Sequence, residues 1–154
     1  MGDHTTYWTD WKDPRVHLFL LVGSLLLIFI SVSNKTPTEL VTEQSTVAAF
    51  EFLHMVDAEE YAQSWEDASA MLQNMLTKKA WMAQLSKIRE MTGPILERTH
   101  DKISYTDEAI NAPPGEYVVI SFVSKFAFKG YVIETITLLL DKSGHWLVAG
   151  YFLK

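Results

Sequence analysis

The chain has 154 residues, which is typical of one globular domain, and 48% of them are hydrophobic. Its formal net charge is -6, and the acidic residues are spread along the sequence, so it lacks the basic patch that nucleic-acid binding requires. There are no cysteines, which excludes disulfides and thiolate metal sites, and no motif indicates a cofactor.

An uncharged apolar segment, VHLFLLVGSLLLIFISV, begins at residue 16. It reaches the lower limit of about 17 residues for a helix that crosses a membrane. Aromatic residues of the kind that favour the membrane interface stand just before it: Tyr7, Trp8 and Trp11. We therefore predict a transmembrane helix at residues 16–33 that serves as a signal anchor. Cleavage after a small-residue site, Ser31-Val32-Ser33, remains an alternative.

The positive charges around this segment predict its orientation. Lys12 and Arg15 precede it, whereas Lys35 alone follows it closely, and the more positive side stays in the cytoplasm. We expect a single-pass protein of the inner (cytoplasmic) membrane, with its C-terminal domain in the periplasm or outside the cell. The expected parts are a cytoplasmic segment (residues 1–15), the membrane helix (16–33), a linker (34–38) and an extracytoplasmic domain (39–154).

Apolar residues recur with helical spacing between residues 39 and 91, which predicts three helices. The first is expected to end near Asp57. The second is expected to begin at Asp57 as the N-cap, with Glu60 in the capping-box position, and to continue to Leu72. The third is expected to begin at Thr77 and to stop at Gly93.

From residue 95 onward the apolar period changes to two, which predicts antiparallel strands. A polar strand is expected around residues 102–107, followed by strands at residues 117–128, 131–140 and 146–153. Alternation places Phe128 on the same apolar face as Val118, and Tyr117 on the outer face of the sheet. Helices followed by strands predict an α+β fold, with the helices packed on one face of a four-stranded antiparallel sheet.

Several segments of the expected outer domain follow the order and spacing of a known bacterial family. They are MVDAEEYAQSWEDA (residues 55–68), APPGEYVV (112–119), SKFAFK (124–129), ETIT (134–137) and GHWLVAGYFL (144–153). The domain thereby resembles domain of unknown function 4019. The resemblance implies a curved sheet, as in the cone-shaped nuclear transport factor 2-like and cystatin-like folds, and an exported or membrane-anchored location. It implies no activity, and Leu147 departs from the arginine usual in the family.

Glu134 carries the most chemical information among the candidate site residues. Strand alternation places it on an apolar face with Val132 and Ile136, where a carboxylate must be paired or neutral. Arg89 lies on the apolar face of the third expected helix, four residues after Leu85. We therefore expect an ion pair between Arg89 and Glu134. A pocket acid and a solvent-facing strand end remain alternatives for Glu134.

Tyr105, Tyr151 and Trp65 are candidates for the lining of a pocket. The alternative is ordinary packing, in which each tyrosine has one hydrogen-bonded tip and Trp65, Trp81 and Trp146 lie in the core. No two histidines have metal-ligand spacing, and no serine lies in a nucleophile elbow. The sequence therefore predicts neither a catalytic residue nor a metal site.

Two functions from different classes follow from these features. The first is a non-enzymatic module, held at the membrane, that binds a protein partner or a small ligand. The second is a hydrolase or isomerase of the cone-shaped fold that uses Glu134 as a general acid or base. The absence of a catalytic motif favours the binding module.

Overall fold

The computed structural model describes residues 35–107 and 112–154 of the chain. In chain order, these residues form α2 (Glu39–Asp57), α3 (Tyr61–Glu66), α4 (Ala70–Met75), α5 (Lys78–Thr92), β1 (Ile95–Thr106), β2 (Tyr117–Phe126), β3 (Gly130–Leu140) and β4 (Trp146–Leu153). The predicted α+β class is confirmed. The expected membrane helix, residues 16–33, lies outside the described residues, and within them no helix is long and apolar enough to cross a membrane.

The helices begin largely at the capping residues that the sequence offers. Thr77 caps α5 as expected, because its side chain accepts a hydrogen bond from the backbone N–H of Ala80. The expected second helix is divided in two, since the side chain of Ser69 caps a separate helix, α4. Asp57 does not cap α3, which has no side-chain cap. It is the last residue of α2, and its carboxylate is hydrogen-bonded elsewhere.

The four strands form one antiparallel sheet in the order β1-β2-β3-β4. β1 begins at Ile95, earlier than expected, and its pairing with β2 contains two register shifts that break strict alternation. Lys35 extends the free edge of β1 through two backbone hydrogen bonds with Tyr105, of 3.0 and 3.1 Å. The expected linker is therefore attached to the sheet at its second residue.

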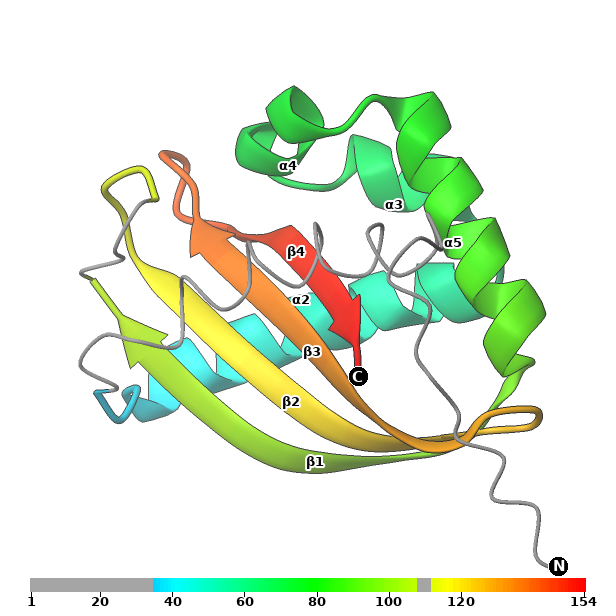
Figure 1. Ribbon diagram of the computed structural model, residues 1–154. Helices are drawn as coiled ribbons and strands as arrows, with labels where there is room; N and C mark the ends of the chain where they lie inside the picture. Colours follow the sequence, from blue (N-terminus) through cyan, green and yellow to red (C-terminus); the bar gives the residue numbers. More distant parts are fainter. Residues whose placement is uncertain (1–34, 108–111) are drawn as a thin grey trace, which may run out of the picture.

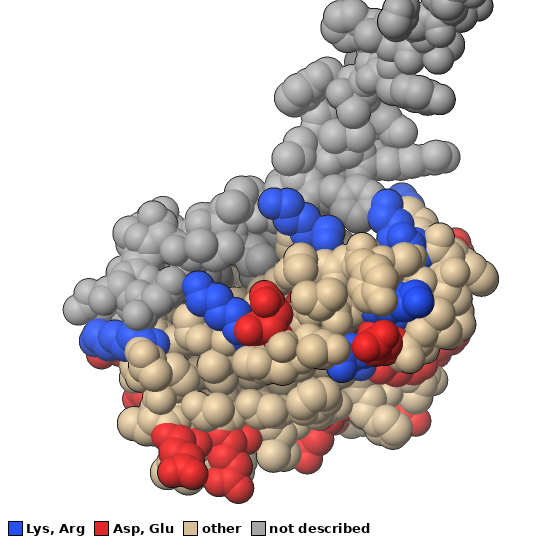
Figure 2. Space-filling view, turned by 90° about the horizontal axis from the view of Figure 1, so that it is seen from below, with Lys and Arg blue, Asp and Glu red and all other residues tan. Residues whose placement is uncertain are grey.

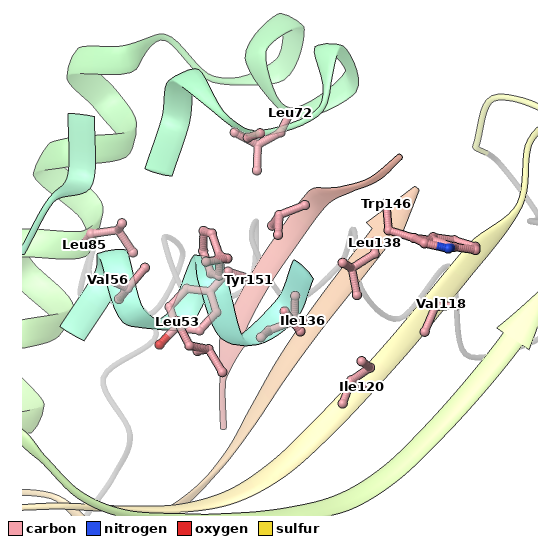
Figure 3. Close-up of a cluster of buried hydrophobic side chains, with 14 of the residues drawn as sticks. Leu53, Val56, Leu72, Leu85, Val118, Ile120, Ile136, Leu138, Trp146 and Tyr151 are labelled. Atoms are coloured by element: carbon pink, nitrogen blue, oxygen red, sulfur yellow. The ribbon is translucent and has the colours of Figure 1, made fainter. Parts of the chain in front are cut away.

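All four described helices lie on the same side of the curved sheet or at its β4 end (Figure 1). α2 runs across the strands, while α3, α4 and α5 form a second group near β4. The core between these layers contains Leu53 and Val56 of α2, with aliphatic side chains of β2 and β3 and the ring of Tyr151 around them (Figure 3).

The burial of the aromatic residues only partly follows the expected pattern. Trp81 and Trp146 are buried as predicted, whereas Trp65 is half-buried and donates a hydrogen bond to the carbonyl of Leu76. Phe128 is 74% exposed because β2 ends at Phe126 and alternation does not extend into the turn. Tyr117, expected on an open face, is fully buried, and its hydroxyl donates a hydrogen bond to the carbonyl of Pro113 in the preceding loop.

Gly93 joins the helical half of the domain to the sheet. It ends α5 with φ 71° and ψ -174°, a combination that is essentially restricted to glycine. A Cβ atom at this position would lie 2.8 Å from the ring of Phe128. The junction between α5 and β1 thus requires a residue without a side chain, both for its backbone angles and for the space that Phe128 occupies.

We predict that Gly93→Ala lowers the free energy of unfolding by about 2–3 kcal/mol, because it adds a clash with Phe128 to the backbone strain. Gly144→Ala is the matched control. Gly144 also has a positive φ, 85°, but a Cβ there would have no heavy atom within 4 Å, so we expect only about 1–2 kcal/mol. Urea unfolding of both variants measures the difference. Equal losses would show that the contact with Phe128 is unimportant.

Candidate functional site

Glu134 lies in the middle of β3 on the face that packs against the helices. Its neighbours on this face, Val132 and Ile136, are buried, and Glu134 itself is 0% exposed. The expected burial of Glu134 beside Val132 and Ile136 is therefore confirmed, although Thr135 and Thr137 between and beyond them are buried as well. A carboxylate removed from water in this way requires hydrogen-bond donors around it.

Three side chains donate to the carboxylate of Glu134. Its Oε1 accepts from the hydroxyl of Tyr151 at 2.6 Å and from Nη2 of Arg98 at 3.2 Å. Its Oε2 accepts from Nε of Arg98 at 2.5 Å and from Oγ of Ser124 at 2.7 Å. A carboxylate has about four acceptor positions, so these four hydrogen bonds occupy all of them. Donors from β1, β2 and β4 therefore converge on a single residue of β3.

The network continues from Arg98 to the end of α2. The Nη1 and Nη2 atoms of Arg98 donate to the two carboxylate oxygens of Asp57 at 2.8 and 3.2 Å. Arg89 lies on the other side of Asp57, with 3.5 Å between Nη2 and Oδ1, and it also donates to the carbonyls of Val56 and Gly93. Two carboxylates and two guanidinium groups thus form a continuous ion-pair network that joins the sheet to the ends of α2 and α5.

The expected ion pair between Arg89 and Glu134 is wrong, because the two residues are connected only through Asp57 and Arg98. Arg98 is the partner of Glu134, and Arg89 contacts Asp57 instead. Arg98 could not be assigned from the sequence because the polar strand was expected to begin only near Lys102. With the observed register, Arg98 pairs with Ser124 across β1 and β2, which places its side chain on the Glu134 face.

Within the network, the pKa values of Arg98 and Tyr151 are raised. Burial alone would lower the pKa of Arg98, but its hydrogen bonds to Asp57 and Glu134 outweigh this effect and raise the pKa. Burial also raises the pKa of Tyr151 well above its usual value, and the negative charge of Glu134 adds to this effect. Arg98 thus remains charged, and Tyr151 remains a neutral donor at physiological pH.

The other two candidate pocket residues do not join Glu134. The hydroxyl of Tyr105 donates to Glu116 at 2.7 Å, and this hydrogen bond is the main reason that its pKa is raised to about 12. Trp65 packs beside the core through its ring. Among the candidates, only Tyr151 contacts Glu134. Within the described residues, no group of three His, Asp or Glu side chains is arranged to hold a metal ion.

Two adjoining hollows, of about 370 and 540 Å³, lie between α2 and the first half of β4. They share Ala48, Glu51, Trp146 and Leu147, and we call them together the α2–β4 groove. Volumes of this size fall in the range of ligand-binding sites. The groove does not include Glu134, and no sequence pattern indicated it, because it depends on how α2 packs beside β4.

The remaining lining of the groove mixes apolar side chains with acidic and other polar ones, which include His54 and His145. Val47, which is 53% exposed, and Leu40 line one hollow, and Phe52, Met55 and Val148 line the other. The acidic members are Glu43, Glu51 and Asp67. This surface is open to solvent and offers both apolar contact and negative charge.

Comparison with known proteins identifies one family. Residues 48–151 match the family model described as "Protein of unknown function (DUF4019)". The match includes Asp57, Arg98 and Glu134 of the ion-pair network and much of the groove. No curated protein matches the chain.

We predict that Glu134→Gln lowers the free energy of unfolding by about 3–5 kcal/mol, because Arg98 loses its buried counter-charge. The control is Glu97→Gln, at an exposed position of β1, where a change within about 0.5 kcal/mol is expected. Thermal and urea unfolding of both variants test this. If Glu134→Gln is as stable as Glu97→Gln or more stable, Glu134 is a strained pocket acid rather than part of a structural network.

Proposed function

The chain belongs to the DUF4019 family, and from this premise we propose that it is a non-enzymatic binding module held at the outer face of a membrane. The observation that carries the proposal is that the buried carboxylate of Glu134 and the open α2–β4 groove are separate parts of the domain. Glu134 is buried in the interior and hydrogen-bonded to protein donors, whereas the α2–β4 groove is open to solvent and is not lined by Glu134. A partner therefore has a surface to bind but no buried acid to react with.

The alternative, a hydrolase or isomerase that uses Glu134, has less support. A general acid or base must come within hydrogen-bond reach of the proton that it transfers. Glu134 is 0% exposed, and its acceptor positions are occupied by Arg98, Ser124 and Tyr151. A substrate could reach it only after these hydrogen bonds were broken. The curved sheet is compatible with the cone-shaped likeness implied by the resemblance, but that fold hosts binding proteins as well as enzymes.

The membrane location rests on the apolar segment at residues 16–33 and on the way the domain begins. Lys35 is already paired to Tyr105 through the backbone, and its ammonium group forms an ion pair with Asp107 at 2.7 Å. A transmembrane helix that ends at residue 33 would leave only Asn34 between the bilayer and this attachment. The proposed anchor thus holds the β1 edge of the domain close to the membrane surface.

We predict that the full-length chain, carrying a C-terminal epitope tag in bacterial cells, remains in the membrane fraction after alkaline extraction, because the apolar segment is buried in lipid. Protease added to spheroplasts is expected to remove the tag while a cytoplasmic control protein stays intact. A tag that is protected until the membrane is broken would contradict the orientation. A soluble product shortened by about 33 residues would show that the segment is a cleaved signal peptide.

We also predict that a photo-crosslinking residue at Gln44, which lies in the groove, forms a discrete adduct in cells producing the full-length chain. The same residue at Ser86, exposed on α5, is the matched control and is expected to give no such adduct. The adduct should decrease when Ala48→Trp fills the groove or Val47→Arg changes its exposed wall. Adducts that are identical at both positions, or unaffected by either groove variant, would refute the groove as the binding site.

A further inference from the structure

Resting on the proposed function, we propose that the occupant of the α2–β4 groove is a cationic amphipathic segment of a partner protein. Such a segment presents apolar side chains flanked by lysine or arginine. The inference rests on the charge of the helices that form the groove, on the absence of internal partners for two of its acidic residues, and on the length of the side of α2 that lines it.

The acidic residues are segregated in the folded domain, although they look dispersed along the sequence. No lysine or arginine occurs between Lys35 and Lys78, a stretch that contains α2, α3 and α4. Its acidic residues are Glu39, Glu43, Glu51, Asp57, Glu59, Glu60, Glu66 and Asp67. In Figure 2, acidic side chains stand along the lower rim of the molecule without lysine or arginine beside them, while the lysines and arginines lie above, with further acidic side chains among them. Asp57 pairs with Arg89 and Arg98, and Glu66 pairs with Lys78, whereas the other six acidic residues of this stretch have no ion pair with a described residue. The helices beside the groove therefore carry an excess of negative charge.

The groove itself repeats this pattern. Glu43, Glu51 and Asp67 line it, and no described lysine or arginine does. Asp67 accepts hydrogen bonds from Gln63, but Glu43 and Glu51 have no hydrogen bond or ion pair with any residue that the structure describes. Their carboxylates are exposed and able to pair with cations supplied by a partner.

The residues of α2 that line the second hollow give the groove a length. Leu40, Val47 and Glu51 are spaced seven and four residues apart along one side of α2, together with Glu43 and Gln44. From Leu40 to Glu51 this side extends for roughly 16 Å at 1.5 Å per residue, enough for about three turns of a bound helix. Leu40 is 62% exposed and Val47 is 53% exposed, so apolar area remains for a partner to bury.

These features favour one chemistry over its competitors. Acidic or phosphate-bearing ligands would be repelled by Glu43 and Glu51. A purely apolar ligand would leave the two carboxylates without partners. A cationic amphipathic segment can use both properties, since its apolar side covers Leu40, Val47 and Leu147 while its flanking charges reach the glutamates. Exposed ion pairs contribute little individually, so apolar burial supplies the larger part of the affinity and the charges supply selectivity.

The test uses the full-length chain with one introduced thiol, which is possible because the sequence contains no cysteine. Gln44→Cys, labelled with an environment-sensitive fluorophore, reports on the groove, and Ser86→Cys on α5 reports on a remote exposed surface. The probes are amphipathic peptides of roughly 12–15 residues, one of leucine and lysine and one in which glutamate replaces every lysine. Titrations are made at about 50 and about 300 mM NaCl.

We expect the lysine peptide to change the emission at position 44 but not at position 86, with weaker binding at the higher salt concentration. The double variant Glu43→Gln/Glu51→Gln should weaken binding roughly three- to tenfold. Glu59→Gln/Glu60→Gln changes the net charge equally outside the groove and should leave the affinity unchanged.

Two results would overturn the inference. If the glutamate peptide binds at position 44 as well as the lysine peptide does, the groove is a binding site without preference for cations, and the proposed function stands. If the two double variants weaken lysine-peptide binding equally, the attraction is to net charge and not to the groove. Absence of the crosslink at Gln44 would instead refute the proposed function. The crosslinking experiment and the peptide titrations therefore distinguish failure of the proposed function from failure of this inference.

Discussion

The arrangement of helices and sheet depends on the burial of one negative charge. Moving a carboxylate out of water costs several kcal/mol, and only a matched counter-charge with further hydrogen bonds offsets that cost. Glu134 meets this requirement with Arg98, Ser124 and Tyr151, which come from the other three strands. Arg98 then needs a second acceptor for its remaining N–H groups, and Asp57 at the end of α2 provides it. The need to neutralise Glu134 therefore also fixes the end of α2 against the sheet.

The ion-pair network that neutralises Glu134 is also distinct from the proposed binding surface. The charged groups of the network hold the domain together, and the acceptor positions of Glu134 are filled by Arg98, Ser124 and Tyr151. The groove lies along α2 from Leu40 to Met55 and along the start of β4, and none of the charged residues of the network lines it. A rigid interior with an exposed groove on one side suits a protein that binds by shape and charge, since the scaffold does not have to move for a partner to be recognised.

The sequence predicted the main architecture because most elements have a strong local signal, the exceptions being the division between α3 and α4 and the start of β1. Thr77 and Gly93 bound α5, and alternation along β3 placed Glu134 on the buried face with a need for a partner. The identity of that partner was not predictable, because two register shifts interrupt β1 and conceal the orientation of Arg98. Glu43 and Glu51 gave no signal either, since a groove arises only from the packing of α2 beside β4. Periodicity reports which face of an element is buried, not which residues of separate elements meet.

The position of Asp57 connects the network to the groove. A carboxylate in the last turn of a helix is opposed by the helix dipole, so Asp57 would destabilise α2 if it stood alone. Arg89 and Arg98 reverse this effect, and Arg89 also donates to carbonyls at the ends of α2 and α5. Arg89 and Arg98 thus neutralise Asp57 at the C-terminal end of α2. Glu43 and Glu51 lie nearer the N-terminal end of the same helix and have no such partners among the described residues, so the groove-facing part of α2 stays negatively charged.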